Sequence, residues 1–378
     1  MAKQLMPVAA PVLDGNEKAY VTDCLESTWI SSSGKYIAKF EDGFAKFCGV
    51  RHAVSCSNGT TALHLGLMAL GVGAGDEVIV PTLTFIATAN AVTYCGARPI
   101  FVDSEPNTWN IDPALIEAKI TPRTKGIIVV HLFGHPVDMD PVLAIARRHG
   151  LFVLEDAAQA HGAEYDGRRV GSLGDIATFS FYGNKIISTG EGGMVVTNDD
   201  HMAAKMRLLK NHGMDPNRRY WHPVIGYNYR MTNVAAAIGV AQLEKVEWQL
   251  RRRREVREWY AKYLQDVPGL EWQREQTPAK HVWWMFSVLL ADQWPVTRDE
   301  VLTRLEECGI EARPVVYPLH SLPPYCDSCP GETFPVAERI ARRGINLPTW
   351  AGLTQEDVCC VCDSLVACLN RSKNGFLL

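Results

Sequence analysis

Ala177-Thr-Phe-Ser-Phe-Tyr-Gly-Asn-Lys185-Ile-Ile-Ser-Thr-Gly-Glu-Gly-Gly193 is the stretch of sequence that decides the fold. A strand-like apolar run delivers a single lysine, Lys185, into a Gly-rich turn, and a second strand-like run, Met194 to Thr197, follows the turn. A lysine amine is nucleophilic only when it is deprotonated, and burial lowers its pKa toward that state. A lysine near a turn, taken alone, is usually a solvated surface charge. Other residues of this chain favour imine (Schiff-base) chemistry instead.

Two carboxylates end a second apolar run about thirty residues upstream. Leu151-Phe-Val-Leu-Glu155-Asp156 is typical of a short buried strand, and Asp156 then lies at the carboxyl end of a sheet, where α/β folds bind their ligands. A carboxylate there can keep a pyridine nitrogen protonated, which makes the ring of pyridoxal phosphate an electron sink. Asp156 alone fits a helix cap equally well. Together with Lys185, it favours the cofactor.

A turn of small residues supplies the third signal. Ser57-Asn58-Gly59-Thr60-Thr61 leads into an apolar helical pattern that runs to about Leu70. Backbone N–H groups at such a helix start form a site for a phosphate group, although the same residues also make an ordinary turn with a helix cap. Taken in order along the chain, the turn, Asp156 and Lys185 predict a site for pyridoxal 5'-phosphate.

Strand-like runs alternate with helical stretches through the first 200 residues, which predicts an α/β fold with a mixed, mostly parallel sheet. The predicted strands are Glu77–Val80, Pro99–Val102, Gly126–Val130, Leu151–Leu154, Ala177–Phe181 and Met194–Thr197. A long helical stretch from about Thr232 to Leu264 follows. We expect a large cofactor-binding domain over residues 1–264, which includes this helix, and a smaller α+β domain over residues 265–378. The predicted elements of the smaller domain are strands Val282–Leu290 and Glu311–Val315 and helices Arg298–Glu307 and Phe334–Arg342.

Charge and composition agree with a soluble enzyme, and we expect the protein to stay in the cytoplasm. The formal net charge is −4 over 378 residues, which gives no electrostatic reason to expect nucleic acid or a membrane as partner. We expect the basic run Arg251–Arg254 to lie on a solvated helix face, paired with Glu255 and Glu258. No secretory signal or membrane span is apparent, so the eleven cysteines are predicted to be reduced.

Two C-x-x-C pairs raise the question of a metal. Cys326 and Cys329 form one pair, and Cys359 and Cys362 form the other. The gap between the pairs is longer than zinc-ribbon spacing, and the second pair follows a helical apolar pattern in which cysteine is a small core residue. The sequence therefore predicts no metal site.

From about Val8 to Ala367 the chain resembles the DegT/DnrJ/EryC1/StrS sugar aminotransferases. The motifs that carry the resemblance are Asn58-Gly-Thr-Thr-Ala-Leu63, Pro81-Thr-Leu-Thr-Phe-Ile-Ala87, Glu155-Asp-Ala-Ala-Gln-Ala160, Gly183-Asn-Lys185, Thr189-Gly-Glu-Gly-Gly193, Tyr227-Asn-Tyr-Arg-Met231 and Pro314-Val-Val-Tyr-Pro-Leu-His320. The resemblance implies a fold type I enzyme that uses pyridoxal phosphate and works as a homodimer, with each active site shared between the two subunits.

The resemblance also assigns roles to individual positions. Lys185 forms the imine with the cofactor and moves the proton, and Asp156 pairs with the pyridine nitrogen. Gln159 approaches the ring hydroxyl and Phe85 stacks on the ring. The expected phosphate ligands are Gly59, Thr60, Thr61, Ser180 and, from the neighbouring subunit, Asn228. The expected nucleotide-sugar contacts are Trp29, Arg219, Trp221, Arg230 and His320.

Two stretches of sequence favour different positions of amination on the sugar. Thr28-Trp-Ile-Ser-Ser32 and Gly213-Met-Asp-Pro-Asn-Arg-Arg-Tyr-Trp221 resemble enzymes that aminate C4 of GDP-4-keto-6-deoxy-D-mannose with L-glutamate as donor. Gln159-Ala-His161-Gly resembles relatives that aminate a 3-keto-6-deoxy sugar, so a 3-aminotransferase is the alternative. We expect His161 to pack against the cofactor strand. A related sugar dehydratase has His in place of Lys185, and a catalytically silent regulatory homologue would lack part of this set.

Overall fold

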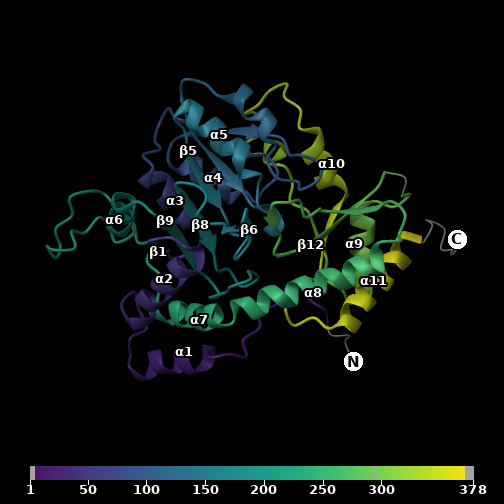
Figure 1. Ribbon diagram of the computed structural model, residues 1–378, viewed down its shortest axis with the longest axis horizontal. Coiled ribbons are helices and arrows are strands. Elements are labelled where there is room, and N and C mark those ends of the chain that lie inside the picture. The colour runs from purple at the N-terminus through teal and green to yellow at the C-terminus, as the bar shows by residue number, and fades with distance from the viewer. Residues whose placement is uncertain (1–4, 293, 371–378) are drawn as a thin grey trace.

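The computed structural model describes residues 5–292 and 294–370 and is built around a central sheet of seven strands (Figure 1). In order across the sheet these are β1 (His52–Cys56), β9 (Gly193–Thr197), β8 (Ile176–Ser180), β5 (Phe152–Asp156), β4 (Thr124–Val130), β2 (Glu77–Pro81) and β3 (Arg98–Val102). Only β9 runs against the others, because it pairs antiparallel with both β1 and β8. The predicted mixed, mostly parallel sheet is confirmed.

The six strands predicted in the first 200 residues are all present, with ends within two residues of the prediction. The seventh strand, β1, was not predicted. Its residues His52-Ala-Val-Ser-Cys56 carry two polar side chains, so the apolar run is short. Ser55 is nevertheless buried, because its N–H and hydroxyl both donate to the buried Glu41 carboxylate, at 2.8 and 2.7 Å.

Helices alternate with these strands along the chain. They are α1 (Glu17–Glu26), α2 (Lys35–Cys48), α3 (Gly59–Ala69), α4 (Ala87–Tyr94), α5 (Met139–His149) and α6 (Asp200–Leu209). Short 3-10 helices span Pro113–Leu115, Glu117–Lys119, Leu132–Gly134 and Leu319–Ser321. The predicted long helical stretch is two helices, α7 (Asn233–Glu244) and α8 (Val246–Leu264), because the backbone leaves helical geometry at Lys245. Lys245 Nζ there donates to the carbonyl of Val12 at 2.6 Å.

A second, antiparallel sheet follows α8. Its strands, in order, are β10 (Leu270–Trp272), β12 (Phe286–Leu290), β14 (Gly344–Leu347) and β13 (Arg313–Pro314). The helices around it are α9 (Arg298–Glu307), α10 (Pro335–Arg343) and α11 (Gln355–Asn370). A third small sheet joins β6 (Glu164–Tyr165) and β7 (Arg168–Arg169) to β11 (Ala279–Lys280).

The second half of α8 packs with this C-terminal sheet. Its buried residues Val256, Tyr260 and Leu264 share an apolar cluster with Phe286 of β12, and Figure 1 shows α8 running past the central sheet to reach α9 and α11. The division into domains at residue 264 stays a prediction. Cys362 of α11 is buried in the same cluster, as the helical pattern of the sequence predicted, whereas Cys359 of the same C-x-x-C pair is only partly buried and lies outside the cluster.

One expectation for α8 is wrong. Arg253 does not lie on a solvated face: it is 2% exposed. Its Nη1 donates to the carbonyl oxygens of Trp284 at 3.0 Å and Thr349 at 3.2 Å. Arg252, in contrast, pairs with Glu255 as expected. Successive helical residues point about 100° apart, so four consecutive arginines cannot share one face.

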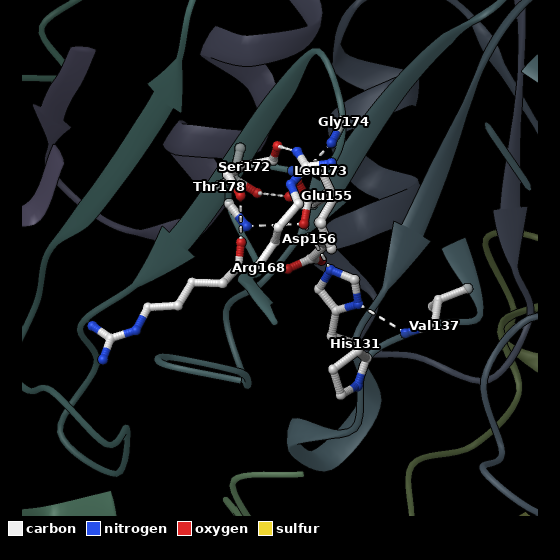
Figure 2. A network of polar contacts seen from close by, with 12 residues as sticks. His131, Val137, Glu155, Asp156, Arg168, Ser172, Leu173, Gly174 and Thr178 are labelled. Carbon is white, nitrogen blue, oxygen red and sulfur yellow. Dashed lines mark hydrogen bonds and ion pairs between the residues drawn. The ribbon is translucent and has the colours of Figure 1, made fainter. Parts of the chain in front are cut away.

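A buried carboxylate ties the end of β5 to the loop that precedes β8 (Figure 2). The Glu155 side chain is fully buried and accepts three backbone hydrogen bonds, from Gly171 N at 2.9 Å, Leu173 N at 2.8 Å and Gly174 N at 2.8 Å. Glu155 therefore holds the chain in place just before it enters β8.

His131 supplies a fourth donor to the same carboxylate. Its Nδ1 accepts from the Val137 N–H at 3.0 Å, so Nε2 carries the proton and donates to Glu155 at 3.1 Å. Burial acts to raise the pKa of Glu155, but the hydrogen bonds from His131 and from the backbone outweigh it, and the pKa lies below its usual range. The carboxylate is thus ionised in the core at neutral pH.

Replacing Glu155 with Gln should destabilise the fold. An amide turns an NH₂ group toward backbone N–H donors, so the free energy of unfolding should fall by about 2–4 kcal/mol at pH 7. Because the pKa of Glu155 is lowered on folding, the advantage of wild type is complete above about pH 5 and is lost as the pH falls through the folded pKa. Urea unfolding followed by circular dichroism at pH 7 and near pH 3 measures both effects.

Glu164→Gln is the matched control. Glu164 pairs with Lys280 at 2.6 Å near the surface, and such pairs contribute about 0–1 kcal/mol. Equal losses in the two variants at pH 7 would contradict the role given to Glu155.

Candidate active site

The predicted site residues gather because six of the seven strands end at one edge of the sheet. The carboxyl end of β1 leads to Gly59, that of β5 carries Asp156, and that of β8 leads to Lys185. Phe85 follows β2 and Gln159 follows β5 at the same edge. Ligands bind at this edge in open α/β sheets.

Lys185 lies in the turn between β8 and β9 and is partly buried. Its backbone N–H donates to the Tyr182 carbonyl at 2.8 Å, and its Nζ lies 3.8 Å from the centre of the Trp284 ring. Burial lowers the pKa of Lys185 to about 8, and the charge of Asp156 acts in the opposite direction. A large fraction of the amine is therefore neutral, and so nucleophilic, near pH 8.

Asp156 is 6% exposed and ends β5. Its Oδ2 accepts from the Thr88 hydroxyl at 2.8 Å, and its Oδ1 accepts from the Ala158 N–H at 3.2 Å. Burial raises the pKa of Asp156, against the effect of these hydrogen bonds and of the Lys185 charge. A cation placed next to this carboxyl would stabilise its ionised form.

The start of α3 forms the expected cradle for an anion. A Cβ on Gly59 would lie 2.7 Å from Cβ of Ser180, so the ends of β1 and β8 approach each other as closely as glycine allows. Asn58 caps α3 and accepts from the Thr61 N–H at 2.9 Å, while the Thr61 hydroxyl donates to the Asn58 carbonyl at 2.8 Å. These bonds commit the polar groups of Thr61 to the cap.

The side-chain amide of Gln159 has a fixed orientation. Its Oε1 accepts from the Phe133 N–H at 2.7 Å, which leaves the Nε2–H groups as donors. His161, two residues on, packs among Phe44, Phe179 and Phe181 as predicted, but within the described residues neither of its buried ring nitrogens has a hydrogen-bond partner. Burial lowers the pKa of His161 to about 3, so its ring is neutral.

Two other predicted residues lie near the end of β2. Phe85 follows this strand and is 59% exposed, so its ring is open to a ligand. His320 approaches the same strand end from far along the sequence, because its Nδ1 bonds to the Thr82 hydroxyl at 2.7 Å. Its Nε2 lies 3.3 Å from the Glu338 carboxylate, and its ring stacks on Phe334.

The remaining predicted residues belong to the segment that follows α6 and to the N-terminal part of the chain. Figure 1 shows the chain after α6 extending away from the sheet. Arg219 lies over the Tyr220 ring and Trp221 lies under Arg218, so these side chains contact their own segment. Trp221 is 51% exposed, and Trp29 is 58% exposed.

The segment returns to the sheet at Asn228 and Arg230. Arg230 Nε donates to Asn228 Oδ1 at 3.0 Å, and Arg230 Nη1 donates to Asn211 at 3.0 Å. The next carbonyl after Asn228, that of Tyr229, accepts from the Ser57 N–H at 2.9 Å. Asn228 therefore lies next in the chain to Tyr229, which contacts the turn before α3.

The model of the DegT/DnrJ/EryC1/StrS aminotransferase family matches residues 11–366. The chain belongs to this family. It is 55% identical to the GDP-perosamine synthase of Caulobacter vibrioides over 369 residues, which cover 96% of this chain and 97% of that one. It is 49% identical to the GDP-perosamine synthase of Escherichia coli O157:H7, over 95% of this chain and 97% of the relative. Among solved structures, DesI in the presence of its TDP-sugar product superposes with a TM-score of 0.91 at 34% identity, over 99% of this chain and 95% of that one.

This family member is an aminotransferase, and its cofactor is pyridoxal phosphate. The residues at the sheet edge fit that group. Gly59 leaves room for a phosphate beside Ser180 and the N-terminus of α3. The buried carboxyl of Asp156 can pair with a cation such as a protonated ring nitrogen. Lys185 offers a partly neutral amine. Within residues 5–292 and 294–370, no three His, Cys, Asp or Glu side chains are grouped to hold a metal ion, and no helix there is long and apolar enough to cross a membrane.

Two residues of this site were not found from the sequence. Thr88, in the first turn of α4, donates to Asp156. Its only sequence signal was its position four residues after Thr84, and the two hydroxyl oxygens lie 3.3 Å apart. Trp284 covers Lys185 from a position about 100 residues further along the chain, and no local pattern in the sequence indicates this contact.

The reactivity of Lys185 should report its surroundings in cofactor-free protein. At pH 8 about half of the Lys185 amine should be neutral, against about 0.4% of an ordinary lysine with a pKa near 10.4. Competitive labelling with an amine reagent between pH 6 and 11, read by mass spectrometry, gives the titration curve. Asp156→Asn removes the attraction that favours the ammonium form, so the curve should move to lower pH. An unchanged curve in that variant would mean that the two groups are not coupled.

Proposed function

We propose that this enzyme transfers the amino group of L-glutamate to C4 of GDP-4-keto-6-deoxy-D-mannose and forms GDP-perosamine. The observation that carries the proposal is the pairing of Lys185 and Asp156 at the sheet edge, two groups whose pKa values are shifted toward neutrality in opposite directions. The likeness to the two GDP-perosamine synthases described above supports a GDP-linked keto sugar as the substrate.

Lys185 Nζ moves the proton in this proposal. In its neutral form it accepts the proton from the α-carbon of glutamate, and in its ammonium form it delivers a proton to C4 of the sugar. A pKa near 8 makes both forms accessible at neutral pH. Glutamate leaves as 2-oxoglutarate before the keto sugar reacts, so the kinetics should be ping-pong.

Pyridoxal phosphate supplies an electron sink for the pair of electrons left on carbon when that proton is removed. Asp156 keeps the proton on the pyridine nitrogen, because an ionised carboxylate in a buried site is stabilised by the N–H that it accepts. Gln159 would offer its Nε2–H groups to the ring hydroxyl, since its oxygen is bonded to Phe133. Gly59, Thr60 and Ser180 would hold the phosphate, with Thr61 shaping the turn through its cap, and Phe85 would stack on the ring.

We assign the nucleotide-sugar to the exposed aromatic and basic residues: Trp29, Arg219, Trp221, Arg230 and His320. Guanidinium groups suit the diphosphate because they bind phosphate oxygens in pairs. Arg219 and Trp221 are both exposed on the segment that follows α6.

We further propose a homodimer in which this segment completes the site of the neighbouring subunit. Three apolar side chains support this, because they are exposed at a level uncommon for a free surface: Tyr220 at 74%, Trp221 at 51% and Ile225 at 91%. Asn228, where the segment ends, then binds the phosphate of the partner's site.

Product analysis tests the reaction. Purified enzyme incubated with GDP-4-keto-6-deoxy-D-mannose and glutamate should yield 2-oxoglutarate and a GDP-linked 4-amino-4,6-dideoxy sugar, identified by NMR. The variant Lys185→Ala should lose turnover by several orders of magnitude, and Lys185→Arg should fare no better, because a guanidinium stays protonated.

Nitrogen at C3, or turnover only of a 3-keto isomer, would instead establish the 3-aminotransferase alternative. Substantial transamination by Lys185→Ala would overturn the assignment of the lysine.

Subunit mixing tests the shared site. Lys185→Ala and Asn228→Asp homodimers should each be inactive, the second because a carboxylate repels the phosphate. Hybrid dimers contain one site that carries neither lesion, so activity should return to about a quarter to a half of wild type after exchange. Hybrids can be isolated with two different affinity tags. Isolated hybrids without activity would place Asn228 in the site of its own subunit.

A further inference from the structure

The side chain that covers the Lys185 amine is Trp284, in the turn between β11 and β12. Lys185 Nζ lies 3.8 Å from the centre of the indole, within the distance at which a cation is attracted to an aromatic face. Trp284 is 8% exposed, so water screens this contact little. None of the roles proposed above involves Trp284.

The indole also holds the backbone that carries the lysine. Trp284 Nε1 donates to the carbonyl of Asn184, the residue before Lys185, at 2.8 Å. One side chain therefore contacts both the main chain next to the lysine and the end of the lysine side chain. Both ends of Lys185 are thereby fixed relative to the same rigid ring.

Trp284 is in turn held from several sides. Its N–H donates to the Phe133 carbonyl at 2.9 Å, and its ring stacks on the Phe133 ring with 23° between the planes. Its carbonyl accepts from the buried guanidinium of Arg253 at 3.0 Å. The same Nη1 also donates to the carbonyl of Thr349 at 3.2 Å, so one guanidinium links the backbone of Trp284 to that of Thr349. The indole is anchored well enough to position another group.

We propose that Trp284 is a positioning residue whose indole face holds the Lys185 amine and whose Nε1–H holds the turn that carries it. An aromatic face attracts an ammonium group but not a neutral amine. The contact therefore retains Lys185 while it carries the proton and releases the amine once the proton has been given up. This inference rests on the proposed role of Lys185.

The test compares Trp284→Leu and Trp284→Phe as cofactor-free proteins, by the competitive labelling described above. Loss of the aromatic face should favour the neutral amine, so the titration of Lys185 should move down by about one pH unit in Trp284→Leu. Trp284→Phe keeps a smaller π face and loses the bond to Asn184, so it should move less and in the same direction. If Trp284→Leu does not fold, the direction in which the Lys185 titration moves in Trp284→Phe decides the question.

Trp283→Leu is the matched control. Trp283 is 1% exposed and lies beside Trp284, but it contacts the His281 ring and the guanidinium of Arg257. Its replacement should leave the Lys185 titration where it is in wild type. An equal shift in both Leu variants would mean general loosening and would overturn the proposal. An upward shift in Trp284→Leu would overturn it as well, since the ring would then act only by excluding water.

Steady-state kinetics of the cofactor-loaded variants separate this inference from the proposed function. Trp284→Leu should lower kcat at least tenfold with KM for the sugar within about threefold, and the acidic limb of its pH profile should move with the titration. If Lys185→Ala is inactive and Trp284→Leu has wild-type labelling and kcat, only the positioning role fails. If Lys185→Ala is active, the proposed function itself fails.

Discussion

The buried carboxylate of Glu155 is the interaction on which the site depends. It satisfies the backbone N–H groups of Gly171, Leu173 and Gly174 and one ring nitrogen of His131, so it fixes the entry to β8 and the exit from β4 at once. Successive strand residues point to opposite faces of a sheet. The neighbouring Asp156 consequently points the other way and is kept free to bond with Thr88. Because of strand geometry, Glu155 thus binds the backbone in the core, while the adjacent Asp156 faces the other side of the sheet.

The same contrast explains their opposite pKa shifts. Both side chains are removed from water, which by itself raises the pKa of each. Glu155 accepts four hydrogen bonds and stays ionised. Within residues 5–292 and 294–370, Asp156 accepts two, from Thr88 and Ala158, and its pKa is raised. A site that must pair with a cationic ring needs the second kind of carboxylate, since one already fully bonded has little further affinity for a cation.

Local chemistry accounts for what the sequence could predict. The Lys185 turn, the carboxylates after Leu154 and the small residues before α3 each combine a strand end with an unusual residue, and such signals lie within a few positions of one another. The contacts that could not be predicted join distant segments. Trp284 covers Lys185, and Arg253 bonds to carbonyls in the second half of the chain, while its own neighbours in the sequence indicated a charged surface. Strand β1 was missed because Ser55 is polar, and only its bond to Glu41 makes its burial possible.

The reversed strand β9 has a consequence for the order in which the molecule assembles. β8 and β9 are joined by a turn of a dozen residues and can pair early, as hairpins do. β1 is hydrogen-bonded only to β9 in the described sheet, with Cys56 opposite Gly193, so it must wait until most of the large sheet has been synthesised. Of the residues assigned to the cofactor, those in the turn before α3 are the first to leave the ribosome and among the last to reach their place. Until then the apolar α3 that follows it lacks β8 and β9, the strands against which it packs, and exposed apolar surface of this kind favours aggregation.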